Sequence, residues 1–259
     1  MTFLDAIILG IIQGLTEFLP VSSSGHIQLG EALLGLGEEH DSLSFTIIVH
    51  AATVLSTIVV FRKDIADLLR GVFSMEKESL TFAGKVVLSM VPAAAAGIFL
   101  EDTIDGWFGD NLTLVGVCLL VTATLLMLTS VAKPGNKKPS FGHVLLIGIS
   151  QAMAILPGVS RSGSTISTAL YLGVDKELAT RFSFLMVIPL ILGATAKKIL
   201  DGPEAGEAVV PAAILAAGFV AAFLAGWAAC KWMVAIVKRG KLWYFAVYCV
   251  IVGLIAIFL

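Results

Sequence analysis

The chain has 259 residues, of which 58% are hydrophobic and only 14% are charged. Soluble domains are about 45–50% apolar and about 25% charged, so this composition indicates an integral membrane protein. A formal net charge of −2, with Lys and Arg scattered over several loops, argues against nucleic acid as a partner. The three cysteines all lie inside apolar runs, which predicts neither a disulfide framework nor a CxxC metal site.

The apolar stretches predict an all-α fold with six transmembrane helices and two re-entrant helical hairpins. A span needs about 20 apolar residues, and each arm of the two hairpins is too short to cross alone. Irregular polar backbone at membrane depth is tolerated where it lines a cavity, so we expect both hairpin tips to do so. In chain order the elements are a hairpin over 3–36, spans over 44–61, 82–100 and 111–132, a hairpin over 142–174, and spans over 180–198, 208–230 and 242–259.

The two halves of this arrangement repeat each other. Segment 10–25 recurs as 148–163, with identical residues at Gly10, Ile11, Gln13, Val21, Ser22, Ser24 and Gly25 and at their counterparts. Because each half contains three spans, an odd number, the halves 1–132 and 142–259 are predicted to be oppositely oriented. Inverted repeats of this kind place a site near the membrane midplane, where the broken helices meet.

Loop charge predicts the orientation of the chain, because Lys and Arg concentrate on cytoplasmic loops. Loops 62–79, 133–141 and 231–241 are basic, whereas loops 101–110 and 199–207 are acidic. If the six spans alternate, all three basic loops lie on one side. Both termini are then outside, the first hairpin enters from outside, and the second enters from inside.

The first tip carries groups suited to metal and proton chemistry. Gln13 and Glu17 are four residues apart, so their oxygen atoms share one helix face and can address one ligand. A carboxylate within the membrane needs a partner, and a metal ion, Arg161 or a proton would each serve. The serines that follow are typical helix N-caps, although one can cap while another reacts. His26 is a candidate general base or acid, whereas His50 is assigned to packing or hydrogen bonding.

The second tip carries groups suited to a phosphate. Arg161 offers a bidentate fork at membrane depth, flanked by hydroxyls and glycines just before a helix. Ser162 and Thr165 are equally able to bond helix backbone. Across both tips the predicted substrate-binding residues are Ser22, Ser24, Gly25, Gly158, Ser160, Ser162, Gly163 and Thr165.

Two stretches, QGLTEFLPVSSSGH and PGVSRSGST, resemble the signature motifs of the undecaprenyl-diphosphate phosphatase family of the bacitracin-resistance type. The resemblance implies hydrolysis of a polyprenyl diphosphate to the monophosphate, which recycles a lipid carrier for cell-envelope glycan synthesis and confers bacitracin resistance. It further implies a divalent metal. Charge predicts its place, because Glu17 would repel a diphosphate unless Mg²⁺ or Ca²⁺, held by Glu17 and Gln13, bridges the two. Catalytic roles carry over to Glu17, Ser23, His26 and Arg161. Position 13 is Gln where Glu is also found, and an amide oxygen is the weaker metal ligand.

These residues predict attack by Ser23, deprotonated by His26, or attack by a water molecule that His26 activates. A transporter or flippase for a phosphate-bearing lipid is the alternative, since inverted repeats around an anion site suit transport equally well. We expect a multi-pass protein of the cell membrane whose site faces outside. Its expected partners are a long-chain polyprenyl diphosphate and membrane lipids, and a second copy of the chain is a candidate.

Overall fold

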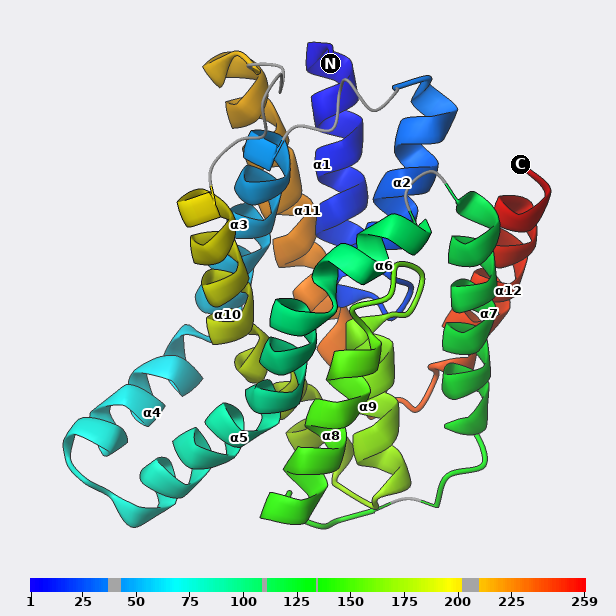
Figure 1. The fold of residues 1–259 in the computed structure, drawn as a ribbon. Coiled ribbons are helices and arrows are strands. Elements are labelled where there is room, and N and C mark those ends of the chain that lie inside the picture. The colour runs from blue at the N-terminus through cyan, green and yellow to red at the C-terminus, as the bar shows by residue number, and fades with distance from the viewer. Residues whose placement is uncertain (37–42, 109–110, 134, 202–209) are drawn as a thin grey trace.

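The computed structural model describes the chain except for residues 37–42, 109–110, 134 and 202–209 (Figure 1). In this described part no strand is formed, and one isolated bridge joins Lys137 to Val174. The all-α prediction is therefore confirmed. The helices are α1 (Phe3–Phe18), α2 (Ser23–Leu34), α3 (Leu43–Val60), α4 (Arg62–Phe73), α5 (Lys77–Phe99), α6 (Glu101–Phe108), α7 (Leu112–Leu128), α8 (Phe141–Met153), α9 (Arg161–Tyr171), α10 (Lys176–Asp201), α11 (Ala212–Lys238) and α12 (Trp243–Phe258).

Four of the described helices, α3, α5, α10 and α11, are long and apolar enough to cross a membrane. Helices α7 and α12 correspond to the other two predicted spans but contain only 17 and 16 residues. They lie side by side, and a Cβ added to Gly116 of α7 would stand 2.5 Å from the carbonyl oxygen of Gly253 of α12. The chain is thus a polytopic membrane protein, with two spans shorter than the sequence indicated.

Helix α4 lies where only a basic loop was expected. Its apolar residues Ile65, Leu68 and Val72 recur with helical spacing, while charged residues occupy other positions. A search for long apolar runs does not detect an amphipathic helix of 12 residues. An ion pair between Asp64 and Arg181 joins α4 to α10.

The structure also describes part of the two predicted acidic loops. Loop 101–110 contains the short helix α6, which was not expected. Residues 109–110 and most of loop 199–207 lie outside the described residues.

The two short hairpins correspond to α1 with α2 and to α8 with α9. Their arms contain 16, 12, 13 and 11 residues, so each is shorter than the spans of 18 residues or more. The open end of α1–α2 lies beside both chain termini, whereas the open end of α8–α9 lies at the opposite end of the bundle (Figure 1). The hairpins therefore enter from opposite ends and their tips meet inside the bundle. The boundaries of the two repeats stay a prediction.

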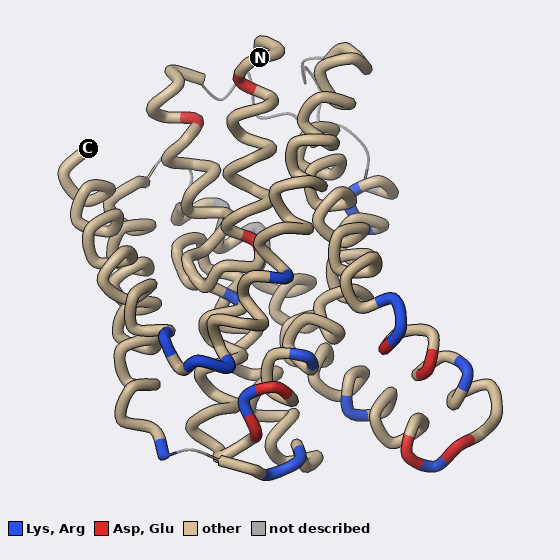
Figure 2. The backbone as a smooth tube through the Cα atoms, turned by 180° about the vertical axis from the view of Figure 1, so that it is seen from behind, with Lys and Arg blue, Asp and Glu red and all other residues tan. Residues whose placement is uncertain are grey.

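The charged residues follow the same axis. Figure 2 shows that most Lys and Arg residues gather in the half of the molecule away from the two termini. This half contains α4, the start of α5 and the segment between α11 and α12. A basic end opposite the termini is the distribution from which the orientation was predicted.

The tips touch through two glycines. A Cβ added to Gly25 would stand 3.1 Å from the Cα atom of Gly158, and Gly158 itself has φ of +92°. A Cβ added to Gly158 would stand 2.4 Å from the carbonyl oxygen of Val115. Only glycine suits that position, because both the backbone conformation and the space exclude a side chain.

We therefore expect Gly158→Ala to destabilise the protein by about 2 kcal/mol or more. The measurement is the midpoint of thermal unfolding in detergent, compared with the wild type. Gly84→Ala on α5 is the matched control, because no atom lies within 4 Å of an added Cβ and its φ is ordinary. An unchanged midpoint for Gly158→Ala would contradict the tight contact between the tips.

Candidate active site

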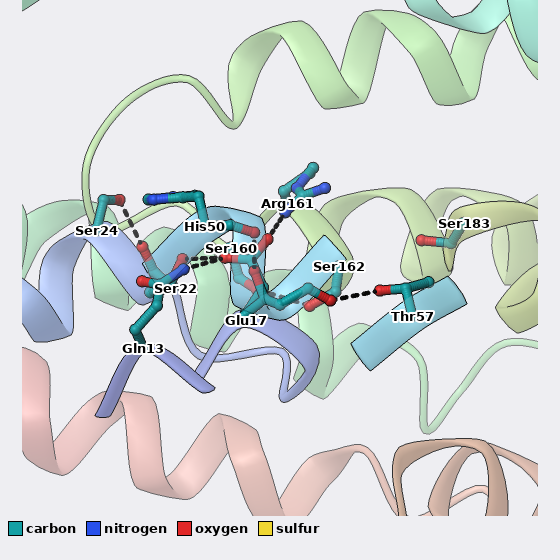
Figure 3. A network of polar contacts seen from close by, with 12 residues as sticks. Gln13, Glu17, Ser22, Ser24, His50, Thr57, Ser160, Arg161, Ser162 and Ser183 are labelled. Atoms are coloured by element: carbon teal, nitrogen blue, oxygen red, sulfur yellow. Dashed lines mark hydrogen bonds and ion pairs between the residues drawn. The ribbon is translucent and has the colours of Figure 1, made fainter. Parts of the chain in front are cut away.

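Glu17 is the centre of the polar network between the tips (Figure 3). It lies in the last turn of α1, where its side chain is 4% exposed. Its Oε1 atom forms an ion pair with Arg161, the first residue of α9. Its Oε2 atom accepts hydrogen bonds from Ser23 Oγ at 2.8 Å and from Gln13 Nε2 at 2.9 Å. One carboxylate thus joins groups from both hairpins.

The partner that the sequence left open for Glu17 is therefore Arg161 in this structure. An isolated buried carboxylate would be costly, and the guanidinium offsets its charge. The Arg161 side chain remains 22% exposed, so part of it is accessible to a ligand while it pairs with Glu17.

Ser22 is the N-cap of α2 and connects the two tips. Its Oγ atom accepts from Gly25 N at 3.5 Å and from Gly158 N at 3.0 Å. Its φ of 72° is unusual for a residue other than glycine. Ser22 therefore caps while Ser23 faces Glu17, which divides the serines as the sequence allowed. Ser24 is exposed and lies 3.4 Å from Ser22, Oγ to Oγ.

The hydroxyls of the second tip are mostly engaged with backbone. Ser160 caps α9 by accepting from Gly163 N at 3.1 Å. Ser162 Oγ donates to the carbonyl of Leu19 at 3.3 Å, and Thr165 Oγ1 donates to that of Arg161 at 2.8 Å. These predicted phosphate ligands thus hold the tip in place, and Arg161 is the group of this segment best placed for an anion.

Gly163 brings the start of α9 close to the first tip. An added Cβ would stand 3.0 Å from Ser160 Cβ and 3.4 Å from Pro20 Cβ. Gly163 and Gly25 therefore serve the close approach of the two tips.

His26 does not face Ser23. Its Nδ1 atom lies 2.8 Å from the carbonyl oxygen of Ser22, and its Nε2 atom lies 2.9 Å from the hydroxyl of Tyr248 on α12. The two rings stack with centroids 5.5 Å apart. Because a carbonyl only accepts, Nδ1 carries the proton and Nε2 accepts from Tyr248. The carboxylate that contacts Ser23 is that of Glu17, and the catalytic role of His26 stays a prediction.

His50 belongs to the site region, although its sequence neighbours gave no sign of it. It lies on α3 at a spacing of three and seven residues from Thr53 and Thr57, so the three share one face. Thr53 and Thr57 line a narrow pocket together with Glu17 and Arg161. His50 is close enough to Glu17 to interact with it electrostatically. The helical periodicity of His50 with these threonines is the signal that could have found it.

The lining of the pocket combines the ion pair with apolar side chains of α10. Beyond Glu17 and Arg161, its lining includes Phe184, Val187 and Ile191. A pocket lined by both charged and apolar side chains suits an amphiphilic ligand.

The donor set fits a cation site that a phosphate would complete. Gln13 is fully buried, and within the described part of the chain its Oε1 atom has no hydrogen-bond partner. The Gln13 side chain lies beside Glu17, since Gln13 Nε2 donates a hydrogen bond to that carboxylate. The described residues contain no group of three or more His, Cys, Asp or Glu side chains that would hold a metal alone. Mg²⁺ is commonly held by one or two carboxylates and substrate phosphates, so two protein oxygens suffice.

The comparisons with known proteins agree with one another. The family model described as "Bacitracin resistance protein BacA" matches residues 6–255. The chain belongs to this family. It is 53% identical to an undecaprenyl-diphosphatase of Christiangramia forsetii, over 99% of this chain and 98% of the relative. Relatives of the same name from Bacteroides fragilis and Parabacteroides distasonis are 50% and 49% identical, again over 99% of this chain and 98% of their own length. Membership of the BacA family thus extends to both hairpin tips.

Proposed function

We propose that the chain hydrolyses undecaprenyl diphosphate to undecaprenyl monophosphate and inorganic phosphate. The relatives that carry this activity in their names match nearly the full length of the chain. The observation that carries the proposal is the joining of Ser23, Glu17 and Arg161 between the two hairpin tips. These are a nucleophile, a base and an anion-binding group. The reaction would recycle a lipid carrier and confer resistance to bacitracin.

In the proposed reaction Arg161 exchanges partners. A diphosphate competes with Glu17 for the guanidinium, and Arg161 then binds the terminal phosphate, whose oxygens gain charge in the transition state. Glu17 keeps its hydrogen bonds from Ser23 and Gln13 and is free to accept a proton. The ion pair thus keeps both charges satisfied until the substrate arrives.

The nucleophile is either Ser23 or a water molecule. In the covalent route, Ser23 Oγ bonds to the terminal phosphorus, its proton passes to Glu17, and the bond to the bridging oxygen breaks as the prenyl monophosphate leaves. Water then hydrolyses the phosphoserine, which releases phosphate and restores Ser23. In the direct route, water attacks the same phosphorus and Ser23 only binds.

A divalent cation, Mg²⁺ or Ca²⁺, is part of the proposal. Gln13 and Glu17 would hold it, with phosphate oxygens completing its coordination. When bound, it would offset the negative charge that Glu17 and the diphosphate bring together. The amide oxygen of Gln13, for which the described residues offer no hydrogen-bond partner, supports this assignment.

We also propose that the protein lies in the cell membrane with both termini outside. The gathering of Lys and Arg at the end away from the termini supports this orientation (Figure 2). The first hairpin would then open to the outside, which suits a site that faces outside. Pairing of two copies of the chain stays a prediction.

The test is phosphate release from a long-chain prenyl diphosphate by the purified protein in detergent, with Mg²⁺ or Ca²⁺ and with EDTA. We expect release with the metal and loss of release with EDTA. Zero release across metals would refute the phosphatase, and flux of the lipid in proteoliposomes without hydrolysis would establish a flippase instead.

Ser23→Ala separates the two routes. In the covalent route we expect turnover to fall by about 10³-fold or more, and labelled phosphate to be trapped on the wild type but not on the variant. Ser130→Ala is a suitable control, because Ser130 is exposed and bonds only the carbonyl of Met127 among the contacts described. Undiminished turnover by Ser23→Ala would exclude the covalent route.

A further inference from the structure

His50 has one ring nitrogen fixed by a hydrogen bond, and among the described residues no hydrogen bond is recorded for the other. Its Nδ1 atom lies 2.9 Å from the carbonyl oxygen of Thr46, one turn earlier on α3. Because a carbonyl can only accept, Nδ1 donates the hydrogen bond and the ring orientation is set. The side chain is half-buried rather than sealed in the core. His50 thus presents its Nε2 edge in a defined direction.

That direction is toward the first tip. In Figure 3 the imidazole extends from α3 toward Ser24, and it lies on the opposite side of the Glu17–Arg161 pair from Thr57 and Ser183. Ser24 is the exposed serine of the tip, whereas Ser22 is occupied as a cap. The polar network therefore extends to two sides of the central ion pair: His50 and Ser24 lie on one side, and Thr57 and Ser183 lie on the other (Figure 3).

The charges of the site and of a diphosphate indicate a role for the side of the ion pair on which His50 and Ser24 lie. Glu17 and Arg161 are the charged residues among those that line the pocket in the described part of the chain, and they offset one another. A diphosphate brings at least two negative charges in two phosphate groups joined by one oxygen. Arg161 binds one of them, and even with the proposed cation beside Glu17 the other phosphate group needs a donor on the far side of the pair. His50 is placed there, and its imidazole is a hydrogen-bonding side chain that α3 brings to that side of the pair (Figure 3).

We propose that His50 is a substrate-binding residue, which holds the phosphate group that Arg161 does not hold, on the Ser24 side of the site. This inference rests on the proposed phosphatase function and adds a second anion-binding side chain to it. His26 does not compete for the role, because both of its ring nitrogens are occupied, by Ser22 and Tyr248.

The test compares His50→Ala with His50→Gln. Alanine removes the donor, so we expect KM for prenyl diphosphate to rise about tenfold or more while kcat changes by less than about threefold. A glutamine amide also places a hydrogen-bond donor at this position, so His50→Gln should restore KM to within about threefold of the wild type. His143→Ala, at the start of α8 and far from the tips, is the matched control and should behave as wild type.

Inhibition by inorganic phosphate, the product, gives a second readout. We expect His50→Ala to weaken it and His50→Gln to retain it. Unchanged KM and unchanged phosphate inhibition in His50→Ala would overturn the inference. So would a His50→Gln variant as impaired as alanine with an equally lowered midpoint of thermal unfolding, since that pattern indicates packing. If wild-type protein releases no phosphate, the proposed function fails; if it does and His50→Ala is unaffected, only the role of His50 fails.

Discussion

Replacing Arg161 with alanine is expected to lower kcat/KM for prenyl diphosphate by about 10³-fold or more. An arginine that contacts a transferring phosphoryl group offsets charge that grows in the transition state, and its removal commonly costs 10³- to 10⁵-fold. Arg161 opens α9 at the second tip and is the cation of the pocket in the described residues. The measurement is phosphate release in detergent at several substrate concentrations, which separates kcat from KM.

Arg161→Lys tests the geometry of the contact separately from its charge. Lysine keeps the positive charge but loses the planar fork that binds two oxygens together. We therefore expect a loss smaller than that of alanine, about 10- to 100-fold. Full activity in the lysine variant would mean that Arg161 acts only as a point charge.

Two controls separate catalysis from folding. Arg161→Ala leaves Glu17 buried without its counter-ion, which destabilises the protein in its own right. The midpoint of thermal unfolding must therefore be measured for each variant. Arg181→Ala is the matched control, because Arg181 also forms an ion pair, with Asp64 of α4, and is not among the residues that line the pocket. Arg161→Ala activity within about tenfold of the wild type would remove the guanidinium from the mechanism.

The hairpins could be predicted from the sequence because they depend on the lengths of neighbouring apolar segments. Arms of 16, 12, 13 and 11 residues around polar tips are visible as short apolar runs. The separate roles of Ser22, which caps α2, and Ser23, which contacts Glu17, could also be predicted, since an N-cap is defined by the residues that follow it. Helix α4 was missed because its apolar residues form a stripe rather than a run.

The partners across the site could not be predicted because they depend on tertiary packing. Arg161 lies 144 residues from Glu17, and the sequence left three kinds of partner open for the carboxylate. Tyr248 lies 222 residues from His26, so the bond that engages the Nε2 atom of that histidine depends on where α12 lies in the fold. His50 joins the site for the same reason, because α3 brings it there from a separate span. Residue types at the tips were predictable, whereas the choice among their partners was not.

Replacing Glu17 with glutamine is expected to lower kcat by about 10²-fold or more without raising KM. Glutamine keeps the size of the side chain and can still accept a hydrogen bond from Ser23, but it cannot take up the proton of that hydroxyl. Loss of a general base commonly costs 10²- to 10⁴-fold. It also offers a proposed cation a neutral oxygen in place of a carboxylate.

The effect on KM is what distinguishes this role from a purely structural one. In the wild type Arg161 is engaged by Glu17, so a substrate phosphate has to displace the carboxylate. Glutamine removes that competition, and phosphate binding should be unchanged or tighter while turnover falls. Glu78→Gln is the matched control, because Glu78 pairs with Lys138 in an exposed ion pair outside the site. If Glu17→Gln instead raised KM and left kcat intact, Glu17 would serve only to orient Arg161, and the proton of Ser23 would need another acceptor.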